Sequence, residues 1–430
     1  MRRRQFLGSL AAATALAATG CSSSTGTSSS GASTGAGGQT VKLVFRQFDP
    51  PTEIAGLTKV VDSWNAANPK IQVKLETLAG ASDYAQQFSR EANSGSGPDV
   101  VQLGFVNVKD LAKPKILLPV SDLAKKSQPE TPVDKFLALD MNEFDNKTWA
   151  LPWTVDTFAM AFNDDVMKAS GRQVPTTWED LRDSAAAISK GGKAAGFVFA
   201  AASSAGAGQW FALNYYMWSK GFALVKQDGK AWVPGASTDQ LASAMDYFNS
   251  LFTSGATPKS FQTVEQFTDP QIVTGVATGT AAMALMPPQT LRQARGTSQK
   301  VMTAPVPDGL KDGSSHLGGR SLGINAATKN PEAAWEFVKY LNSAKAFESI
   351  PQYPAATTVL KAMEVPAGEE GYQKQLPHSR SFARYINGPV PVPTLQKLSC
   401  AAFGAVYSGQ KTSAQSAKEL VDALAVALKG

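Results

Sequence analysis

The sequence predicts an α/β protein with two domains. Even without its first 40 residues, the 430-residue chain exceeds the size at which one hydrophobic core usually stops growing. Residues 41–50 begin as an alternating, β-rich run, residues 57–65 place apolar side chains at helical spacing, and residues 71–78 alternate again. A strand, a helix and a strand in this order form a βαβ unit, which implies a parallel sheet covered by helices.

Residues 1–20 have the features of an export signal. Three arginines at positions 2–4 precede an apolar run from Phe6 to Ala18 that is too short to span a membrane. Arg3-Arg4-Gln5-Phe6-Leu7 also resembles the twin-arginine export pattern. Ala18-Thr19-Gly20-Cys21 resembles a bacterial lipobox, although leucine is usual where Ala18 stands. The resemblance implies lipidation at Cys21; the alternative is cleavage elsewhere, with Cys21 a bystander.

Residues 21–40 are expected to form a tether after the lipidated cysteine. Beyond Cys21 they carry no charge and almost no residue larger than threonine, so they cannot bury enough apolar surface to fold. A random coil of this length reaches about 25 Å. We therefore expect the folded body to be exported and anchored to the outer face of the cytoplasmic membrane. Cys400 is the one other cysteine, so no internal disulfide is expected.

Composition and motifs favour binding over catalysis. The formal charge of +6 includes the three arginines of the export signal, so no nucleic-acid partner is indicated. The two histidines, His316 and His378, do not stand in a metal-binding spacing, and no metal or cofactor is expected. The sequence has no GxSxG, no GxxxxGK[ST] and no GxGxxG after a strand. The sequence has no later apolar run of about 18 residues, so a second membrane segment is not expected.

Local patterns place further elements along the chain. A helical stretch around 84–93 leads into a glycine-rich turn and a short buried strand within 94–104. Asp145-Asn146-Lys147 predicts a hairpin turn, and Thr176 or Thr177 predicts the N-terminal cap of the next helix. A hairpin is also expected around Trp232.

Several blocks, in order, resemble one protein family. These blocks are NPKIQV (68–73), SGSGPDVV (94–101), TWALPWTVDTFAMAFNDDVMKASG (148–171), PTTWEDL (175–181), TGTAAMALMPP (278–288), VMTAPVPDG (301–309), GGRSLGINAATKNPEAAWEFVKYL (318–341) and SGQKTSAQSAKELVDAL (408–424). Together they resemble the carbohydrate-binding family of extracellular solute-binding proteins of bacterial ABC importers. The resemblance implies an α/β, two-lobed periplasmic-binding-protein-like fold, with discontinuous lobes joined by hinge crossings. The expected division is 41–150 and 305–345 for the first lobe, and 151–304 and 346–430 for the second.

The resemblance also implies a function. A carbohydrate would be captured in the cleft between the lobes by hinge closure and delivered to an ABC transporter permease, and the receptor is expected to be a monomer and not an enzyme. One alternative is an exported carbohydrate-active enzyme, for which Asp140, Glu143, Asp164 and Asp165 are carboxylates close in sequence. Another alternative is a sensor or adhesin on the same fold.

A carbohydrate site needs aromatic platforms for sugar rings and polar groups for hydroxyls. The candidate platforms are Trp153, Trp210, Tyr215 and Trp218, and core packing is the alternative for each. Trp64, Trp178 and Trp335 lie at helical positions and are expected in the core. The candidate polar residues are Gln47, Asp49, Asp99, Asp156 and Gln289. Gln47 and Asp49 follow the first strand, whereas Asp99 could equally cap backbone groups of its Gly-Pro-Asp turn.

Arg46 and Arg320 stand where many relatives of this family carry an aromatic residue. A guanidinium can stack on a ring, bond hydroxyls or grip a carboxylate with a forked pair of hydrogen bonds. We therefore expect a ligand with an acidic or strongly polar group, recognised by Arg320 and also by Arg46. The alternative for each arginine is a structural ion pair or a solvated position.

Overall fold

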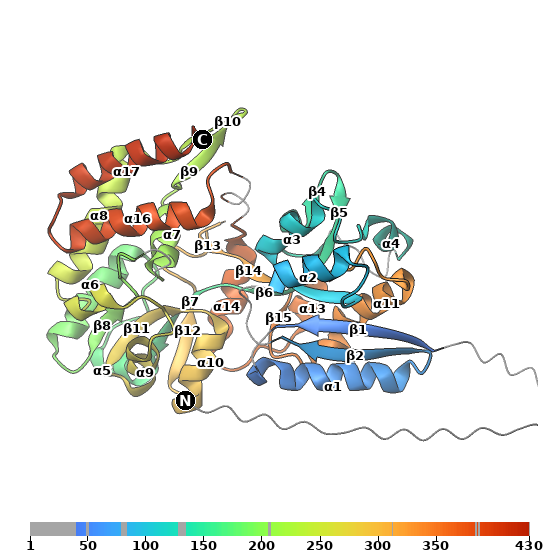
Figure 1. Cartoon of the computed structure of the whole chain (residues 1–430). Helices are drawn as coiled ribbons and strands as arrows, with labels where there is room; N and C mark the ends of the chain where they lie inside the picture. Colours follow the sequence, from blue (N-terminus) through green and yellow to red (C-terminus); the bar gives the residue numbers. More distant parts are fainter. Residues whose placement is uncertain are drawn as a thin grey trace, which may run out of the picture. The chain divides into compact units, whose positions relative to one another are not determined.

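The computed structural model describes residues 40–48, 51–78, 84–127, 135–204, 208–311, 313–382, 385 and 388–429. The expected export signal, Cys21, the tether and Asp49 lie outside these residues. From Thr40 onward the chain contains two large sheets, and each sheet is the centre of one lobe (Figure 1).

The first lobe is built on a mixed sheet of six strands, in the order β15-β6-β14-β3-β1-β2. β1 runs parallel to β2 and β3, which confirms the predicted βαβ unit, whereas β14 runs antiparallel to β3 and β6. β6 therefore belongs to this sheet, although the predicted division assigns most of its residues to the second lobe; the exact boundaries stay a prediction. The strands are β1 (Val41–Gln47), β2 (Ile71–Thr77), β3 (Val100–Gly104), β6 (Ala150–Asp156), β14 (Gly318–Ile324) and β15 (Tyr353–Pro354).

Helices cover this sheet because each presents an apolar stripe to it. Leu57, Val60 and Trp64 of the first helix pack with Phe45 of β1 and with Phe337, so the predicted core position of Trp64 is confirmed. Trp335 is buried in the same core. The helices are α1 (Pro51–Ala67), α2 (Tyr84–Asn93), α3 (Phe105–Ala112), α4 (Ser121–Lys126), α11 (Pro331–Leu341), α12 (Ala344–Phe347) and α13 (Thr357–Ala362).

The second lobe is built on a four-stranded sheet in the order β12-β7-β11-β8. β11 pairs antiparallel to β7 and parallel to β8. Both central strands are buried along their whole length, as expected for a sheet with helices on its two faces. The strands are β7 (Ala159–Asn163), β8 (Ala195–Val198), β11 (Ala281–Met286) and β12 (Val301–Ala304).

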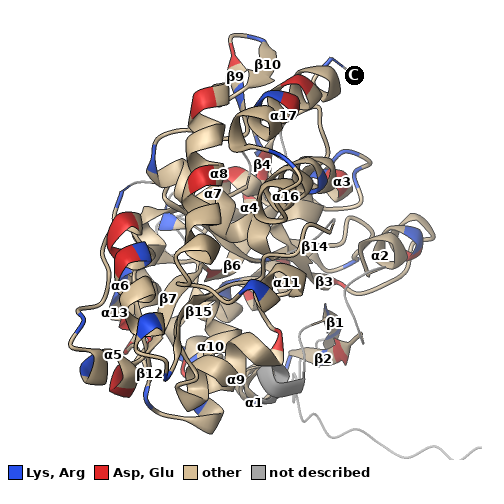
Figure 2. Ribbon diagram, turned by 90° about the vertical axis from the view of Figure 1, so that its left-hand side faces the viewer, with Lys and Arg blue, Asp and Glu red and all other residues tan. Residues whose placement is uncertain are grey.

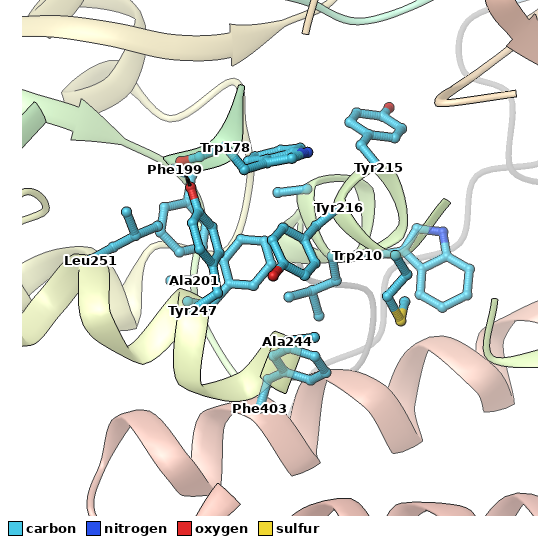
Figure 3. Close-up of a cluster of buried hydrophobic side chains, with 14 of the residues drawn as sticks. Trp178, Phe199, Ala201, Trp210, Tyr215, Tyr216, Ala244, Tyr247, Leu251 and Phe403 are labelled. Atoms are coloured by element: carbon cyan, nitrogen blue, oxygen red, sulfur yellow. Dashed lines mark hydrogen bonds between the residues drawn. The ribbon is translucent and has the colours of Figure 1, made fainter. Parts of the chain in front are cut away.

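A large aromatic core holds the helices of the second lobe together. Figure 3 shows Trp178, Tyr216, Tyr247 and Phe403 converging in it, and Trp178 is fully buried as predicted. At the C-terminal end α17 packs against α8 and α16. The helices are α5 (Asp164–Ser170), α6 (Trp178–Lys190), α7 (Gln209–Ser219), α8 (Thr238–Thr253), α9 (Pro270–Thr278), α10 (Pro288–Thr297), α14 (Glu370–Gln375), α16 (Val392–Tyr407) and α17 (Ser413–Ala427).

Short two-residue and four-residue strands form three small sheets. The predicted hairpin joins β4 (Glu143–Phe144) to β5 (Lys147–Thr148), and Asp145 and Asn146 both have positive φ, at 54° and 57°. Two left-handed residues match the strand twist in such a turn. β9 (Val225–Asp228) and β10 (Ala231–Pro234) form the hairpin expected around Trp232, while β13 (Ser315–His316) pairs with β16 (Ser379–Arg380).

Capping residues fix the helix starts. Thr177 accepts the N–H of Asp180 at 3.1 Å, so the predicted cap of α6 is Thr177 rather than Thr176. Lys and Arg are interspersed with Asp and Glu on α6 and α17 (Figure 2), where pairs such as Lys418 and Asp422 meet at 2.6 Å. Among the described residues, no helix combines the length and the apolar character that crossing a membrane requires.

Candidate functional site

Strands β6 and β14 lie side by side at the crossing between the lobes, where the first-lobe sheet faces the second lobe. Their register shifts next to Arg320, because Arg320 pairs with Thr154 and Ser321 pairs with Pro152. A bulge of this kind bends a strand and redirects its side chains. β14 also begins with two glycines, and Gly319 has a φ of +145°, where a Cβ would lie 2.0 Å from the carbonyl oxygen of Thr154. The close approach of the two strands therefore requires glycine.

A narrow pocket with a cavity volume of about 10 Å³ lies at this crossing. Strands β6, β14 and β15 of the first lobe form part of its wall, and the first turn of α10 in the second lobe closes it. Both lobes thus supply side chains to one site, as hinge closure on a ligand requires. The lining residues are Thr154, Val155, Asp156, Pro288, Gln289, Arg292, Arg320, Gln352 and Tyr353.

The pocket combines three of the predicted polar residues. Asp156, Gln289 and Arg320 all line it, although they are far apart in the sequence. The guanidinium carbon of Arg320 lies 5.1 Å from the ring centre of Phe48, which is a cation–π distance. A carboxylate, an amide and a guanidinium together can donate to and accept from the hydroxyls of a polyol.

An aromatic cluster, which we call the aromatic wall, adjoins Asp156. It consists of Phe158, Phe211, Phe267 and Phe382, with ring centres 4.7 to 6.3 Å apart for the contacting pairs. All of them except Phe267 also contact the imidazole of His316. Phe211, Phe267 and Phe382 are only partly buried, so part of each side chain reaches the molecular surface. The sequence analysis did not single these residues out, because nothing near them in sequence distinguishes them from core phenylalanines.

His316 joins the aromatic wall to the polar pocket. Its Nε2 lies 3.7 Å from Oδ1 of Asp156, and its Nδ1 lies 2.6 Å from the hydroxyl of Tyr215. The backbone carbonyl of His316 accepts a hydrogen bond from the hydroxyl of Thr157 at 2.7 Å. Burial lowers the pKa of His316 to about 3, so the imidazole is neutral at neutral pH.

A buried ion pair forms the far side of the pocket. Arg292 of α10 donates from Nε and Nη2 to the two carboxylate oxygens of Glu369, each at 2.9 Å. Tyr353 of the first-lobe sheet donates to the same carboxylate at 2.6 Å, and Glu369 is 3% exposed. Arg292 also donates to the carbonyl of Pro351. The group ties α10 of the second lobe to the edge of the first-lobe sheet beside the pocket.

Two predicted polar residues have structural partners away from this pocket. Arg46 forms ion pairs with Glu76 at 3.1 Å and Glu91 at 2.5 Å, which is the structural arrangement named above as the alternative to ligand recognition. Asp99 accepts the N–H of Val44 at 2.8 Å and the hydroxyl of Thr328. Its carboxylate therefore has the structural role that the sequence analysis left open.

Gln47 and the four predicted platforms are also enclosed by protein. The amide of Gln47 is buried and donates to the hydroxyl of Thr77 at 2.8 Å. Trp153 is 1% exposed and donates to the carbonyl of Leu341, which places it in the first-lobe core. The candidate site does not include either side chain.

Three of the predicted platforms belong to α7, in which every residue except Phe211 is buried. Trp210, Tyr215 and Trp218 are 3%, 0% and 6% exposed, and Figure 3 shows the first two within the second-lobe core. Trp218 donates to the hydroxyl of Tyr385 at 3.0 Å. These three rings support the aromatic wall from behind rather than offering a face to a ligand.

The described residues contain no group of three or more His, Cys, Asp and Glu side chains suited to a metal ion. Cys400 is buried in α16, and burial raises the pKa of its thiol to about 12. A protonated, enclosed thiol is a poor nucleophile and a poor metal ligand.

Known proteins are similar to this chain in sequence. The diacetylchitobiose binding protein DasA of Streptomyces coelicolor is 24% identical over 358 residues, which cover 77% of this chain and 81% of that protein. The sn-glycerol-3-phosphate-binding periplasmic protein UgpB of Escherichia coli is 29% identical over 156 residues, or 33% of this chain and 35% of that protein.

Solved structures match over nearly the whole chain. The GacH receptor of Streptomyces glaucescens, solved unliganded and with acarbose, has a TM-score of 0.70 at 22% identity and covers 91% of this chain and 99% of its own. An extracellular solute-binding protein from Staphylococcus aureus in complex with maltose has a TM-score of 0.70 at 18% identity, covering 91% and 99%. These likenesses confirm the predicted two-lobed, periplasmic-binding-protein-like fold.

A family model described as bacterial extracellular solute-binding protein matches residues 49–346. Membership in a family of binding proteins agrees with the expectation that this chain binds rather than catalyses. Because the match covers more than half of the chain, the protein belongs to the bacterial extracellular solute-binding proteins.

Proposed function

We propose that this protein is the receptor of an ABC importer and captures a carbohydrate in the pocket between its lobes. The observation that carries the proposal is the pocket itself, where Asp156 and Arg320 of the first lobe meet Gln289 of the second beside the aromatic wall. Sugars present apolar ring faces and a rim of hydroxyls, and this combination of side chains complements both. Relatives solved with maltose and acarbose support a carbohydrate ligand.

The sugar would be captured by hinge closure of the two lobes and would not be chemically changed. Asp156 and Arg320 stand on strands of the first-lobe sheet, whereas Gln289 stands on α10 of the second lobe. A sugar gains all of these contacts only when the lobes close on it, so binding shifts the population toward the closed state. The closed receptor would then deliver the sugar to the membrane permease.

A ligand screen tests the proposal. The full chain carrying Cys21→Ser would be heated with maltose, maltotetraose, diacetylchitobiose, glucuronate and sn-glycerol 3-phosphate in turn. A ligand at 100 times its Kd adds about 2.7 kcal/mol to the free energy of unfolding, so a true ligand raises the Tm measurably. Stoichiometric binding of an unchanged sugar supports the receptor, whereas release of shorter products indicates the enzyme alternative. No binding across neutral and acidic sugars overturns the carbohydrate assignment.

Anchoring and transport need separate tests, because the ligand screen addresses neither. We propose that lipid at Cys21 holds the protein at the outer face of the membrane and that the receptor is a monomer. In the producing cell, radiolabelled palmitate should label the wild type, and Cys21→Ser should release the protein to the medium. Deleting the gene should abolish uptake of the sugar that binds; unchanged uptake would favour a sensor or adhesin.

A further inference from the structure

Tyr215, His316 and Asp156 lie in a row that leads from the second-lobe core to the pocket. The hydroxyl of Tyr215 is 2.6 Å from Nδ1 of His316, and Nε2 on the other edge of the ring is 3.7 Å from Oδ1 of Asp156. Tyr215 is fully buried, His316 is 6% exposed, and Asp156 is partly exposed and lines the pocket. The row therefore ends at the carboxylate that would face a ligand.

The surrounding residues fix the imidazole in one place. The rings of Tyr215 and His316 are nearly parallel, with an angle of 4° between their planes, and Phe158, Phe211 and Phe382 lie 5.2 to 5.5 Å from the imidazole centre. The ring has little room to turn within this aromatic wall. Its two nitrogens consequently keep their separate neighbours, the phenol on one side and the carboxylate on the other.

Gly318 makes the contact between His316 and Asp156 possible. A Cβ at position 318 would lie 2.4 Å from Oδ1 of Asp156 and 2.9 Å from Nε2 of His316. Contacts this short do not occur, so any side chain here would separate the two groups. The glycine that opens β14 thus leaves space for the imidazole edge and the carboxylate to face each other.

The two neighbours select one tautomer of the neutral imidazole. Burial keeps the pKa of Tyr215 well above its usual value, so the phenol retains its proton and can donate it to Nδ1. When the phenol donates in this way, the ring proton resides on Nε2, on the edge of the ring that lies 3.7 Å from the carboxylate of Asp156. The opposite tautomer would place the lone pair of Nε2 against a negative charge.

We propose that His316 is a positioning residue that, held by Tyr215, orients the carboxylate of Asp156 toward the hydroxyls of a bound sugar. The inference rests on the proposed function for its ligand, but the arrangement itself can be measured without one. At 3.7 Å the imidazole edge is too far from the carboxylate for a direct hydrogen bond, so it limits the orientations of the Asp156 side chain by its position and its partial charge before the ligand arrives.

The tautomer is the first test. The chain contains only two histidines, so ¹⁵N-histidine labelling of the Cys21→Ser chain gives the ring-nitrogen signals of two imidazoles, and His378→Gln assigns those of His316. We expect His316 to carry its proton on Nε2 at neutral pH, and Tyr215→Phe to mix the tautomers. A proton on Nδ1 in the otherwise unchanged chain would overturn the proposal.

The second test separates positioning from simple packing. His316→Phe fills the aromatic wall without a donor, and His316→Gln keeps a donor near the position of Nε2. With whichever of maltose, maltotetraose, diacetylchitobiose or sn-glycerol 3-phosphate binds, we expect His316→Phe to weaken affinity about tenfold and His316→Gln to weaken it by less than threefold. In an Asp156→Asn background, His316→Phe should have no further effect.

Two results decide against the inference. If His316→Phe binds as tightly as the wild type, or weakens binding equally with and without Asp156, His316 does not act through the carboxylate. If none of the four probes binds the wild type, the carbohydrate function is what fails, and the tautomer then decides: a proton on Nε2 supports the positioning of Asp156, and a proton on Nδ1 refutes it.

Discussion

At the scale of single residues, Arg46 and Arg320 carry the same charge in different surroundings. Arg46 is 9% exposed and bridges Glu76 and Glu91, whereas Arg320 lines the pocket beside Phe48. Removing the first guanidinium leaves two partly buried carboxylates close together, while removing the second changes a wall of the proposed site. The two arginines therefore form a natural pair of test and control.

We predict that Arg46→Gln lowers the stability of the protein and that Arg320→Gln lowers its affinity for ligand. Arg46→Gln should lower the free energy of unfolding by about 1–3 kcal/mol and leave ligand affinity within twofold. Arg320→Gln should weaken an acidic ligand at least tenfold, because a charged hydrogen bond is lost. Denaturant titration and calorimetry measure the two quantities. Unchanged affinity in Arg320→Gln for the true ligand would remove the acidic-group hypothesis.

The lowered pKa of His316 predicts that the free energy of unfolding depends on pH. Its pKa is about 3 in the folded protein and about 6.5 when unfolded, so between these values the unfolded chain binds a proton that the folded one does not. Stability should fall as pH falls from 6.5 toward 3, with a contribution approaching about 1.4 kcal/mol per pH unit. Urea titrations at pH 6 and pH 4 should show a smaller difference for His316→Phe than for the wild type.

At the scale of elements, the start of β14 depends on glycine. At Gly319 the φ is +145° and a Cβ would meet the backbone of Thr154, whereas Gly296 near the end of α10 has no atom within 4 Å of the same position. A side chain at the first site must displace the neighbouring strand. At the second site it fills open space and favours the helix.

We predict that Gly319→Ala destabilises the protein by more than about 2 kcal/mol and that Gly296→Ala leaves it unchanged or stabilises it by up to about 1 kcal/mol. Denaturant unfolding of the two variants compares the same Gly→Ala substitution at the two positions. Similar stability of both would mean that β14 can move away from β6 at little cost.

The elements differ in how far the sequence alone could predict them. The βαβ unit, the hairpin at Asp145 and Asn146 and the cap at Thr177 follow from local periodicity and turn chemistry, and the structure has all three. The exposure of α7 could not be predicted, because its aromatic residues lie on every side of the helix. Only the packing of distant segments shows that Trp210 and Trp218 are enclosed while Phe211 reaches the surface.

At the scale of the whole molecule, the pocket is assembled from segments that are distant in sequence. Asp156, Gln289 and Arg320 were expected at a site from the family resemblance, and they line one pocket. The partners of His316 could not be predicted, since Tyr215 precedes it by 101 residues and Phe382 comes from the C-terminal segment. The residues near His316 in the sequence do not indicate either contact.

The ion pair of Arg292 with Glu369 in the second lobe, which Tyr353 of the first-lobe sheet joins, gives a prediction at this scale. Arg292→Met leaves a carboxylate that is 3% exposed without its cation, which should cost about 3–5 kcal/mol of unfolding free energy. Arg172→Met, at an exposed position, is the control and should stay within about 0.5 kcal/mol of the wild type. Chemical denaturation compares them, and equal stability would show that Glu369 finds another partner or a proton.

Because the thiol of Cys400 is buried, closure of the lobes can be followed with a dye on a cysteine introduced elsewhere. Once Cys21 is replaced, Cys400 is the sole cysteine in the chain, and its enclosure in α16 and raised pKa make it unreactive toward maleimides in the folded state. A cysteine introduced at the pocket rim, such as Gln352→Cys, would then be the single labelled site. An environment-sensitive dye there would convert closure on a solute into a fluorescence change, which makes this receptor a scaffold for a reagentless biosensor.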